Sequence, residues 1–153
     1  MTSRPPDLST DVFTPEKRSA VMRRVKGRDT TPELAARRIL RAAGIGYRLG
    51  GSGLAGRPDI VMKGRWLAVF VHGCFWHGHD CPRGSRKPKA NAAYWTAKID
   101  RNRARDAASE AALIAAGWRV ITVWECAIKA PDFPERLLAA VRGQAAAVSI
   151  SSP

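Results

Sequence analysis

The 153-residue sequence has few acidic side chains, only three cysteines and no long apolar run. Its longest apolar segment, residues 67–71, is far too short to span a bilayer, and the first residues offer no apolar core for a signal peptide. An odd number of cysteines without an export signal argues against a disulfide framework. We therefore expect a cytoplasmic protein whose cysteines bind a metal, take part in catalysis or are simply buried.

The shortage of acid leaves 26 Lys and Arg against 13 Asp and Glu, a formal net charge of +13. Lys and Arg that neutralise phosphates release condensed counterions, so this balance favours a nucleic acid partner over an anionic membrane surface. The positive residues gather in two segments, residues 17–28 and residues 83–105. We expect these segments to hold a duplex from two sides.

The length suits a single core, and 45% hydrophobic with 25% charged residues is typical of a globular protein. We expect a flexible N-terminal arm over residues 1–13, one domain over residues 14–143 and a flexible C-terminal tail over residues 144–153. The tripeptide Thr-Pro-Glu at residues 14–16 and again at residues 31–33 predicts two helix starts. The second helix should cover residues 33–43, with Arg37, Arg38 and Arg41 facing solvent.

The remaining pattern predicts a sheet flanked by helices. Apolar segments at residues 59–62 and 66–71 form a hairpin, and an Ala-rich helix follows over residues 93–116. A buried strand at residues 118–123 and a helix at residues 134–142 complete the order. Strand, crossover helix and strand indicate an α/β fold with a mixed sheet and at least one parallel pair.

All three histidines and two of the three cysteines fall within residues 72–81. Thiolate and imidazole are the ligands that zinc prefers, and a structural site needs four of them. Cys74, His79 and Cys81 supply three from one segment, and Cys126 is either the fourth ligand or a buried apolar thiol. His72 and His77 are then left for chemistry.

Asp59 follows Gly56-Arg57-Pro58 at the start of a predicted strand. A carboxylate in this place can bind a hard cation such as Mg²⁺, although Pro-Asp is also a common turn dipeptide. The paired strand ends at His72, so the hairpin would bring a carboxylate and an imidazole to one edge. Glu33 is a candidate second acid, or only a first-turn residue that suits the helix dipole.

Several motifs together resemble one family. They are Gly-Arg-Pro-Asp at residues 56–59, His-Gly-Cys-Phe-Trp-His at residues 72–77, Tyr94-Trp95, Lys98-Ile99, Asn102, and Gly-Trp-Arg-Val to Val-Trp-Glu-Cys over residues 117–126. This combination resembles the very-short-patch repair (Vsr) DNA mismatch endonucleases. The resemblance implies a restriction-endonuclease-like fold with a structural zinc site. It also implies a Mg²⁺-dependent, strand-specific nick in duplex DNA 5′ of the T in a T:G mismatch, such as deamination of 5-methylcytosine creates.

The resemblance also implies roles for individual residues. Asp59 and the backbone carbonyl of Val71 would bind Mg²⁺, and His72 stands where related nucleases carry a lysine. His77 would be the general base, with Asp106 as its partner. Zinc would be held by the four residues Cys74, His79, Cys81 and Cys126.

The same resemblance assigns four residues to the mismatch. Phe75, Trp76 and Trp95 would wedge into the base stack from the major groove, and Met22 would enter from the minor groove. Without the resemblance, Trp95 would be interpreted as a core residue. The partners expected are double-stranded DNA with a T:G mismatch and, as a functional link, a DNA cytosine-5 methylase; we expect a monomer without a membrane partner.

Two other functions agree with parts of the pattern. A non-catalytic, zinc-stabilised DNA-binding module would explain the charge and the Cys/His segment. A nuclease of the same fold without mismatch selectivity would explain the acidic site. The tryptophans at residues 66, 118 and 124 lie in or beside predicted strands, and we interpret them as packing residues.

Overall fold

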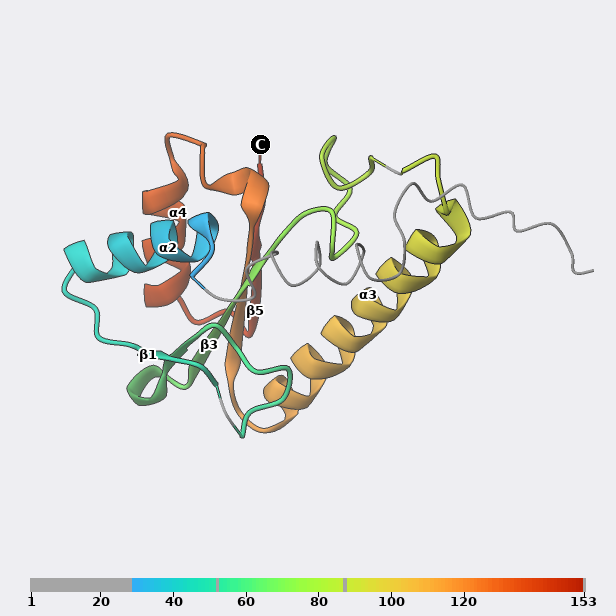
Figure 1. The fold of residues 1–153 in the computed structure, drawn as a ribbon. Helices are drawn as coiled ribbons and strands as arrows, with labels where there is room; N and C mark the ends of the chain where they lie inside the picture. The colour runs from blue at the N-terminus through green and yellow to red at the C-terminus, as the bar shows by residue number, and fades with distance from the viewer. Residues whose placement is uncertain (1–28, 52, 87, 153) are drawn as a thin grey trace, which may run out of the picture.

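The computed structural model describes residues 29–51, 53–86 and 88–152 (Figure 1). Its centre is a five-stranded sheet in the order β1-β2-β3-β4-β5. The strands are β1 (Arg48–Leu49), β2 (Ile60–Met62), β3 (Leu67–His72), β4 (Arg119–Trp124) and β5 (Ala147–Ile150). β1, β2 and β3 pair antiparallel, whereas β3, β4 and β5 pair parallel. This is the mixed α/β sheet that the sequence predicted.

Helices cover both faces of the sheet. α2 (Thr31–Ala42) and α4 (Phe133–Arg142) lie together on one face, and α3 (Ala92–Ala115) crosses the other (Figure 1). Two short 3-10 helices, η1 (Lys63–Arg65) and η2 (Glu125–Ala127), follow β2 and β4. The side chains of β3 alternate between the faces, so that Val69 packs under α2 and α4 while Phe70 packs under α3.

The ends of α2 follow from its sequence. The Thr30 hydroxyl accepts a hydrogen bond from the backbone N–H of Glu33, and Pro32 occupies the first turn, where its missing N–H is not needed. Gly44 ends the helix with φ +72°, a conformation that glycine adopts without strain. The predicted helix at residues 33–43 is therefore confirmed.

Two predictions about the surface of α2 are wrong. Arg37, expected to face solvent, is only 9% exposed because Glu33 and Asp29 pair with its guanidinium. In the sequence Leu34 shares an apolar stripe with Ala35 and Ile39, which predicts that it is buried, but it is 44% exposed. The helix turns its buried side toward α4 through Ala36 and Leu40.

The flexible tail expected over residues 144–153 is also wrong for part of its length. Residues 147–150 form β5, which pairs in parallel with β4 from Val120 to Val123. Ile150 is buried, and the Arg136 guanidinium donates a hydrogen bond to the carbonyl of Ser151. The strand has only four residues, Ala-Val-Ser-Ile, and they do not alternate between apolar and polar, so the sequence carries no clear strand pattern.

Predictions for the N-terminal arm, the helix after Thr14, the basic segment 17–28 and Met22 lie outside the described residues. Within the described ranges, no helix combines the length and the apolar character that a membrane span requires.

Candidate active site and metal centre

A cavity of about 830 Å³ opens where β3 and β4 end, between α2 and α3. Its lining includes all the residues that the sequence analysis assigned to catalysis: Glu33, Asp59, His72, His77 and Asp106. They come from α2, the start of the β2–β3 hairpin, the end of β3, the segment after β3 and the middle of α3. The fold therefore brings together side chains that are up to 73 positions apart in the sequence, from residue 33 to residue 106.

Asp59 is fixed by the hairpin. Its carboxylate Oδ2 accepts a hydrogen bond of 2.7 Å from the backbone N–H of Val71, and its own N–H donates to the carbonyl of Val69. Burial raises the pKa of Asp59 to about 6, against the opposing effect of the Val71 hydrogen bond, and the charge of Glu33 raises it further. An ionised Asp59 is thus poorly stabilised by the protein alone, which favours a bound cation.

The two histidines of the cavity stack on each other. The rings of His72 and His77 lie 3.8 Å apart and almost parallel, at 3°. Burial and the neighbouring His77 lower the pKa of His72 to about 4, so His72 is neutral at neutral pH. Stacking against this neutral ring fixes the plane of His77.

Asp106 on α3 orients His77. The His77 Nδ1 and the Asp106 Oδ2 lie 2.5 Å apart, a hydrogen bond that turns the opposite nitrogen, Nε2, away from Asp106. Burial raises the pKa of Asp106, but the hydrogen bond with His77 and the nearby positive charges outweigh burial and hold it below its ordinary value. An imidazole held by an ionised carboxylate is an arrangement suited to accept a proton.

Glu33 is a buried member of an ion-pair network. Its Oε2 accepts hydrogen bonds from Arg37 Nη2 at 3.1 Å and from the backbone N–H of Asp29 at 3.0 Å. Arg37 also binds the carboxylate of Asp29 at 2.7 Å. The network anchors α2 beside Asp59, a role that goes beyond that of an exposed first-turn acid.

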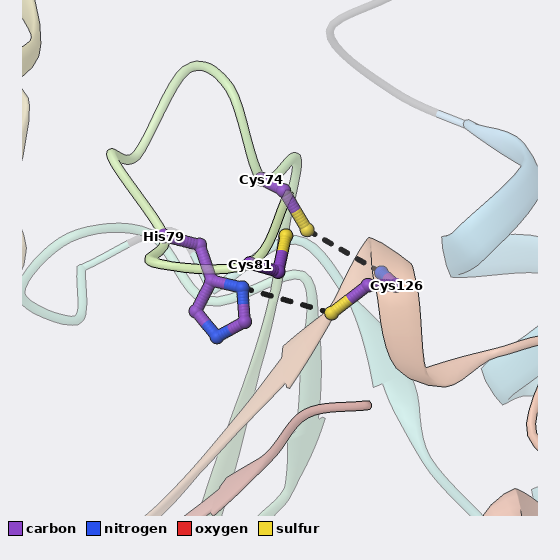
Figure 2. A group of neighbouring side chains, drawn as sticks. All are labelled: Cys74, His79, Cys81 and Cys126. Atoms are coloured by element: carbon purple, nitrogen blue, oxygen red, sulfur yellow. Dashed lines mark hydrogen bonds between the residues drawn. The ribbon is translucent and has the colours of Figure 1, made fainter. Parts of the chain in front are cut away.

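A second cluster lies next to the cavity, and Figure 2 shows how its side chains converge from different segments. Cys74, His79 and Cys81 come from the segment after β3, and Cys126 comes from η2. One donor atom from each of the four residues lies within 4.8 Å of the others. Three thiols and an imidazole at this spacing form a donor set that could hold a metal ion.

Backbone N–H groups face each sulfur of this cluster. Cys74 Sγ accepts from the N–H of Cys126 at 3.4 Å (Figure 2), Cys81 Sγ from Gly84 at 3.3 Å, and Cys126 Sγ from Ser152 at 3.4 Å. Burial raises the pKa of Cys74 to about 12, so a neutral thiol is stable there unless a cation compensates the thiolate. The N–H donors would stabilise the thiolates that form once a cation is bound.

The aromatic residues predicted to wedge into DNA form one cluster beside the cavity. The rings of Phe75, Trp76 and Trp95 lie 5.1 to 5.8 Å from one another, and Lys98 lies over both tryptophans. All three rings are partly exposed. The alternative that Trp95 is a core residue is therefore wrong, because it packs on other surface aromatics instead of the sheet.

Known proteins are similar to this chain over most of its length. The family model for the DNA mismatch endonuclease Vsr matches residues 10–83. The DNA mismatch endonuclease Vsr of Escherichia coli K12 is 34% identical over 148 residues, which cover 93% of this chain and 94% of that relative. The chain belongs to the Vsr family. Membership identifies it as a DNA endonuclease of mismatch repair, and the mixed sheet agrees with the restriction-endonuclease-like fold of Vsr proteins.

Other Vsr relatives carry the name of nicking enzymes. The type II nicking enzyme V.XorIIP of Xanthomonas oryzae pv. oryzae is 50% identical over 117 residues, 76% of this chain and 85% of the relative. The type II nicking enzyme V.NmeAIP of Neisseria meningitidis serogroup A is 43% identical over 120 residues, 78% of this chain and 85% of the relative. These names agree with a DNA-cleaving enzyme and give no support to the non-catalytic DNA-binding module considered from the sequence.

One residue of this Vsr site was missed by sequence analysis. Trp124, interpreted as a packing residue, stacks on His79 at 4.3 Å and meets His72 edge-on at 5.3 Å. It thus joins the cysteine cluster to the cavity, and its indole N–H donates to the hydroxyl of Ser149. The signal available in the sequence was its place in the Val-Trp-Glu-Cys motif, two residues before Cys126; the structure adds that Trp124 lies opposite His72 in the register of β3 and β4.

Proposed function

We propose that this protein is a Mg²⁺-dependent endonuclease that nicks duplex DNA on the 5′ side of the T in a T:G mismatch and so initiates very-short-patch repair. The observation that carries the proposal is one arrangement. The half-buried Asp59 carboxylate and the His77–Asp106 pair line one cavity, and the partly exposed aromatic cluster lies beside it, with Trp76 in the lining. Groups proposed for the reaction and groups proposed for recognition therefore lie next to one another.

In this proposal His77 is the general base. Asp106 binds Nδ1, so Nε2 carries the lone pair that removes a proton from the attacking water. Asp106 also stabilises the imidazolium that forms, because its own low pKa keeps it ionised. His72 stays neutral and buried, and its part is to hold the His77 ring by stacking.

The oxygen donors of the cavity suit Mg²⁺, and the sulfur and nitrogen donors of the cysteine cluster suit Zn²⁺. Asp59, with the backbone carbonyl of Val71, would hold magnesium through oxygen, and Glu33 adds negative charge nearby. Bound magnesium would supply positive charge to the phosphate at the transition state. Cys74, His79, Cys81 and Cys126 would hold zinc as a structural ion, since all four positions come from the protein.

The aromatic cluster supports mismatch recognition. Inserting side chains between base pairs requires unstacking, a few kcal/mol per step, and this is least beside a weakened pair such as T:G. Phe75, Trp76 and Trp95 are large, partly exposed and already gathered, so little ordering is left for the DNA complex. Met22 is the proposed minor-groove partner, and it lies outside the described residues.

The proposal is tested with end-labelled duplexes that carry T:G or T:A at one position. We expect a single nick 5′ of the T in the T:G duplex, none in the T:A duplex, and loss of nicking when Mg²⁺ is omitted and zinc is left in place. Cleavage of both duplexes alike would overturn the mismatch selectivity and favour the unselective nuclease.

Two variants separate chemistry from recognition. Asp59→Asn is expected to bind the T:G duplex and leave it intact, because it loses the metal carboxylate. Trp95→Ala is expected to keep the site around Asp59 and to lose preference for T:G over T:A by tenfold or more, on the order of one stacked aromatic. Unchanged selectivity in Trp95→Ala would contradict the wedge.

A further inference from the structure

Arg57 is the cationic side chain nearest in sequence to Asp59, and both line the same cavity. Five carboxylates line this cavity, and its only other guanidinium groups within the described ranges are those of Arg103 and Arg105. A DNA phosphate that approaches these carboxylates is repelled unless cations compensate. Arg57 is therefore placed where a polyanionic substrate needs positive charge.

The other two arginines have contacts of their own. The side chain of Arg103 packs against Gly78, where an added Cβ would come within 2.8 Å of its Cδ. Arg105 lies close enough to Asp106 for its charge to lower the pKa of that carboxyl group. In the part of the chain that the structure describes, Arg57 is exposed and forms no ion pair with a carboxylate.

The backbone at Arg57 is in an unfavourable conformation. Its φ is +51°, in the left-handed region that side chains with a Cβ disfavour, and its N–H donates to the carbonyl of Leu54. Gly56, just before it, has φ +73°. Glycine at residue 57 would form the same turn without strain, so an arginine here calls for a role of its side chain.

The turn is held firmly on both sides. Gly51 donates to the carbonyl of Pro58 at 2.9 Å, and the backbone of Gly56 packs on Ser109 of α3, where an added Cβ would come within 2.7 Å of its Cβ. Ser109 is one helical turn from Asp106. The Arg57 side chain thus leaves a backbone fixed relative to both Asp59 and α3.

We propose that Arg57 binds a phosphate of the strand being cleaved, beside the phosphodiester that faces Asp59. This inference rests on the proposed function, because it assigns a substrate contact to the same site. A guanidinium binds phosphate oxygens through two parallel hydrogen bonds, and a fixed backbone preserves this geometry. The contact is independent of base identity and serves to place the strand.

The test uses Arg57→Gly, which removes the guanidinium and suits the backbone, and Arg57→Lys, which keeps the charge. The control is Arg65→Ala, which removes one exposed charge on η1 at the far end of the hairpin. Fluorescence anisotropy without Mg²⁺ gives the Kd for a T:G duplex at several salt concentrations. Thermal unfolding confirms that each variant folds.

We expect Arg57→Gly to unfold at the same or a higher temperature than the parent, and to bind about tenfold more weakly at 0.1 M salt. Its plot of log Kd against log salt should lose about 0.9 in slope, the contribution of one phosphate. Arg57→Lys should keep the slope and recover part of the affinity. Arg65→Ala should change Kd less than threefold.

Equal effects of Arg57→Gly and Arg65→Ala would overturn the inference. The inference would also be overturned if Arg57→Gly unfolds at a lower temperature than the parent and Arg57→Lys binds the duplex no better than Arg57→Gly. The outcome is independent of the mismatch experiment: a parent that cleaves T:A and T:G alike, but loses affinity in Arg57→Gly, contradicts the proposed selectivity and leaves the phosphate contact standing.

Discussion

The carboxyl group of Asp59 occupies a place that disfavours its ionised form. Burial and the nearby Glu33 raise its pKa from 3.8 to about 6, so the native state takes up a proton between these values while the unfolded chain does not. Stability of the Mg²⁺-free protein therefore falls as pH rises from about 4 to about 6. Above that range both states are ionised, and the native state keeps the unfavourable charge.

The first prediction is that Asp59→Asn stabilises the Mg²⁺-free protein at pH 7.5. The gain should be about 1 to 3 kcal/mol, because the shift of about two units is partly screened by solvent. It should vanish at pH 4, where the native Asp59 is protonated. Urea unfolding of both proteins at the two pH values measures the difference.

The matched control for this prediction is Asp100→Asn, which neutralises an exposed carboxylate on α3. Its effect should stay within about 0.5 kcal/mol at both pH values. A destabilised Asp59→Asn at pH 7.5 would show that the Val71 hydrogen bond, not burial, dominates the environment of Asp59.

The sequence identified the residues that the fold brings together at the site, but not what surrounds them. The histidines and cysteines were recognisable because those residue types cluster within residues 72–81. The burial of Arg37 could not be recognised in the sequence, since it depends on the carboxylates of Glu33 and Asp29 one to two turns away. Trp124 was missed because its partners come from the neighbouring strand β3 and the segment after it.

At the scale of elements, β5 does more than extend the sheet. It covers the open edge of β4, and residues just beyond it donate to Cys126 and accept from Arg136. The strand thus fastens η2, α4 and the cysteine cluster to the same edge. Truncation of this segment would uncover β4 and remove one N–H donor from the cluster.

The second prediction concerns Ile150, the buried end of β5. Ile150→Ala should lower the free energy of unfolding by about 2 to 5 kcal/mol, because the side chain is only 1% exposed. Chemical denaturation measures this loss. Ser149→Ala, on the exposed side of the same strand, should lose no more than about 1 kcal/mol with its indole hydrogen bond.

A flexible tail would make both substitutions neutral, so equal stability of the Ile150→Ala and parent proteins would contradict the strand.

The sequence could not predict β5 because residues 147–150 include Ala and Ser. α2 and α3 were predictable because local signals sufficed: Thr30-Thr31-Pro32 at one start, and Gly117 with φ +90° after the end of α3. Strand pairing, in contrast, depends on segments distant in the chain.

At the scale of the molecule, the cysteine cluster joins three regions. The segment after β3, η2 and the C-terminal residues meet there through side chains and N–H donors. We therefore predict about one zinc ion per purified chain. Removing a ligand by Cys126→Ser should lower both the zinc content and the unfolding temperature.

Zinc content is measured with a metal-sensitive dye after denaturation, and His77→Ala is the matched control because His77 is a histidine of the same segment outside the cluster. It should keep its zinc. A metal-free parent that unfolds at the same temperature as the zinc-loaded protein would contradict a structural role for the ion.

The net charge of +13 and the acidic cavity are complementary at this scale. The excess of positive charge attracts a polyanion, whereas the carboxylates gather in the cavity where, in the proposed function, the cleaved phosphate meets a metal ion. The total charge can be read from the sequence, but the gathering of carboxylates in the cavity depends on the fold, which brings Glu33 of α2 and Asp106 of α3 to Asp59, the residue before β2.

The side chains of residues 72–81 belong to three different groups. His72 and His77 face the cavity, Phe75 and Trp76 join the aromatic cluster, and the cysteines with His79 form the metal donor set. An insertion or deletion of one residue would misplace all three groups at once. A segment that serves three groups at once can vary in side chains that belong to none of them, but its length is constrained by all three together.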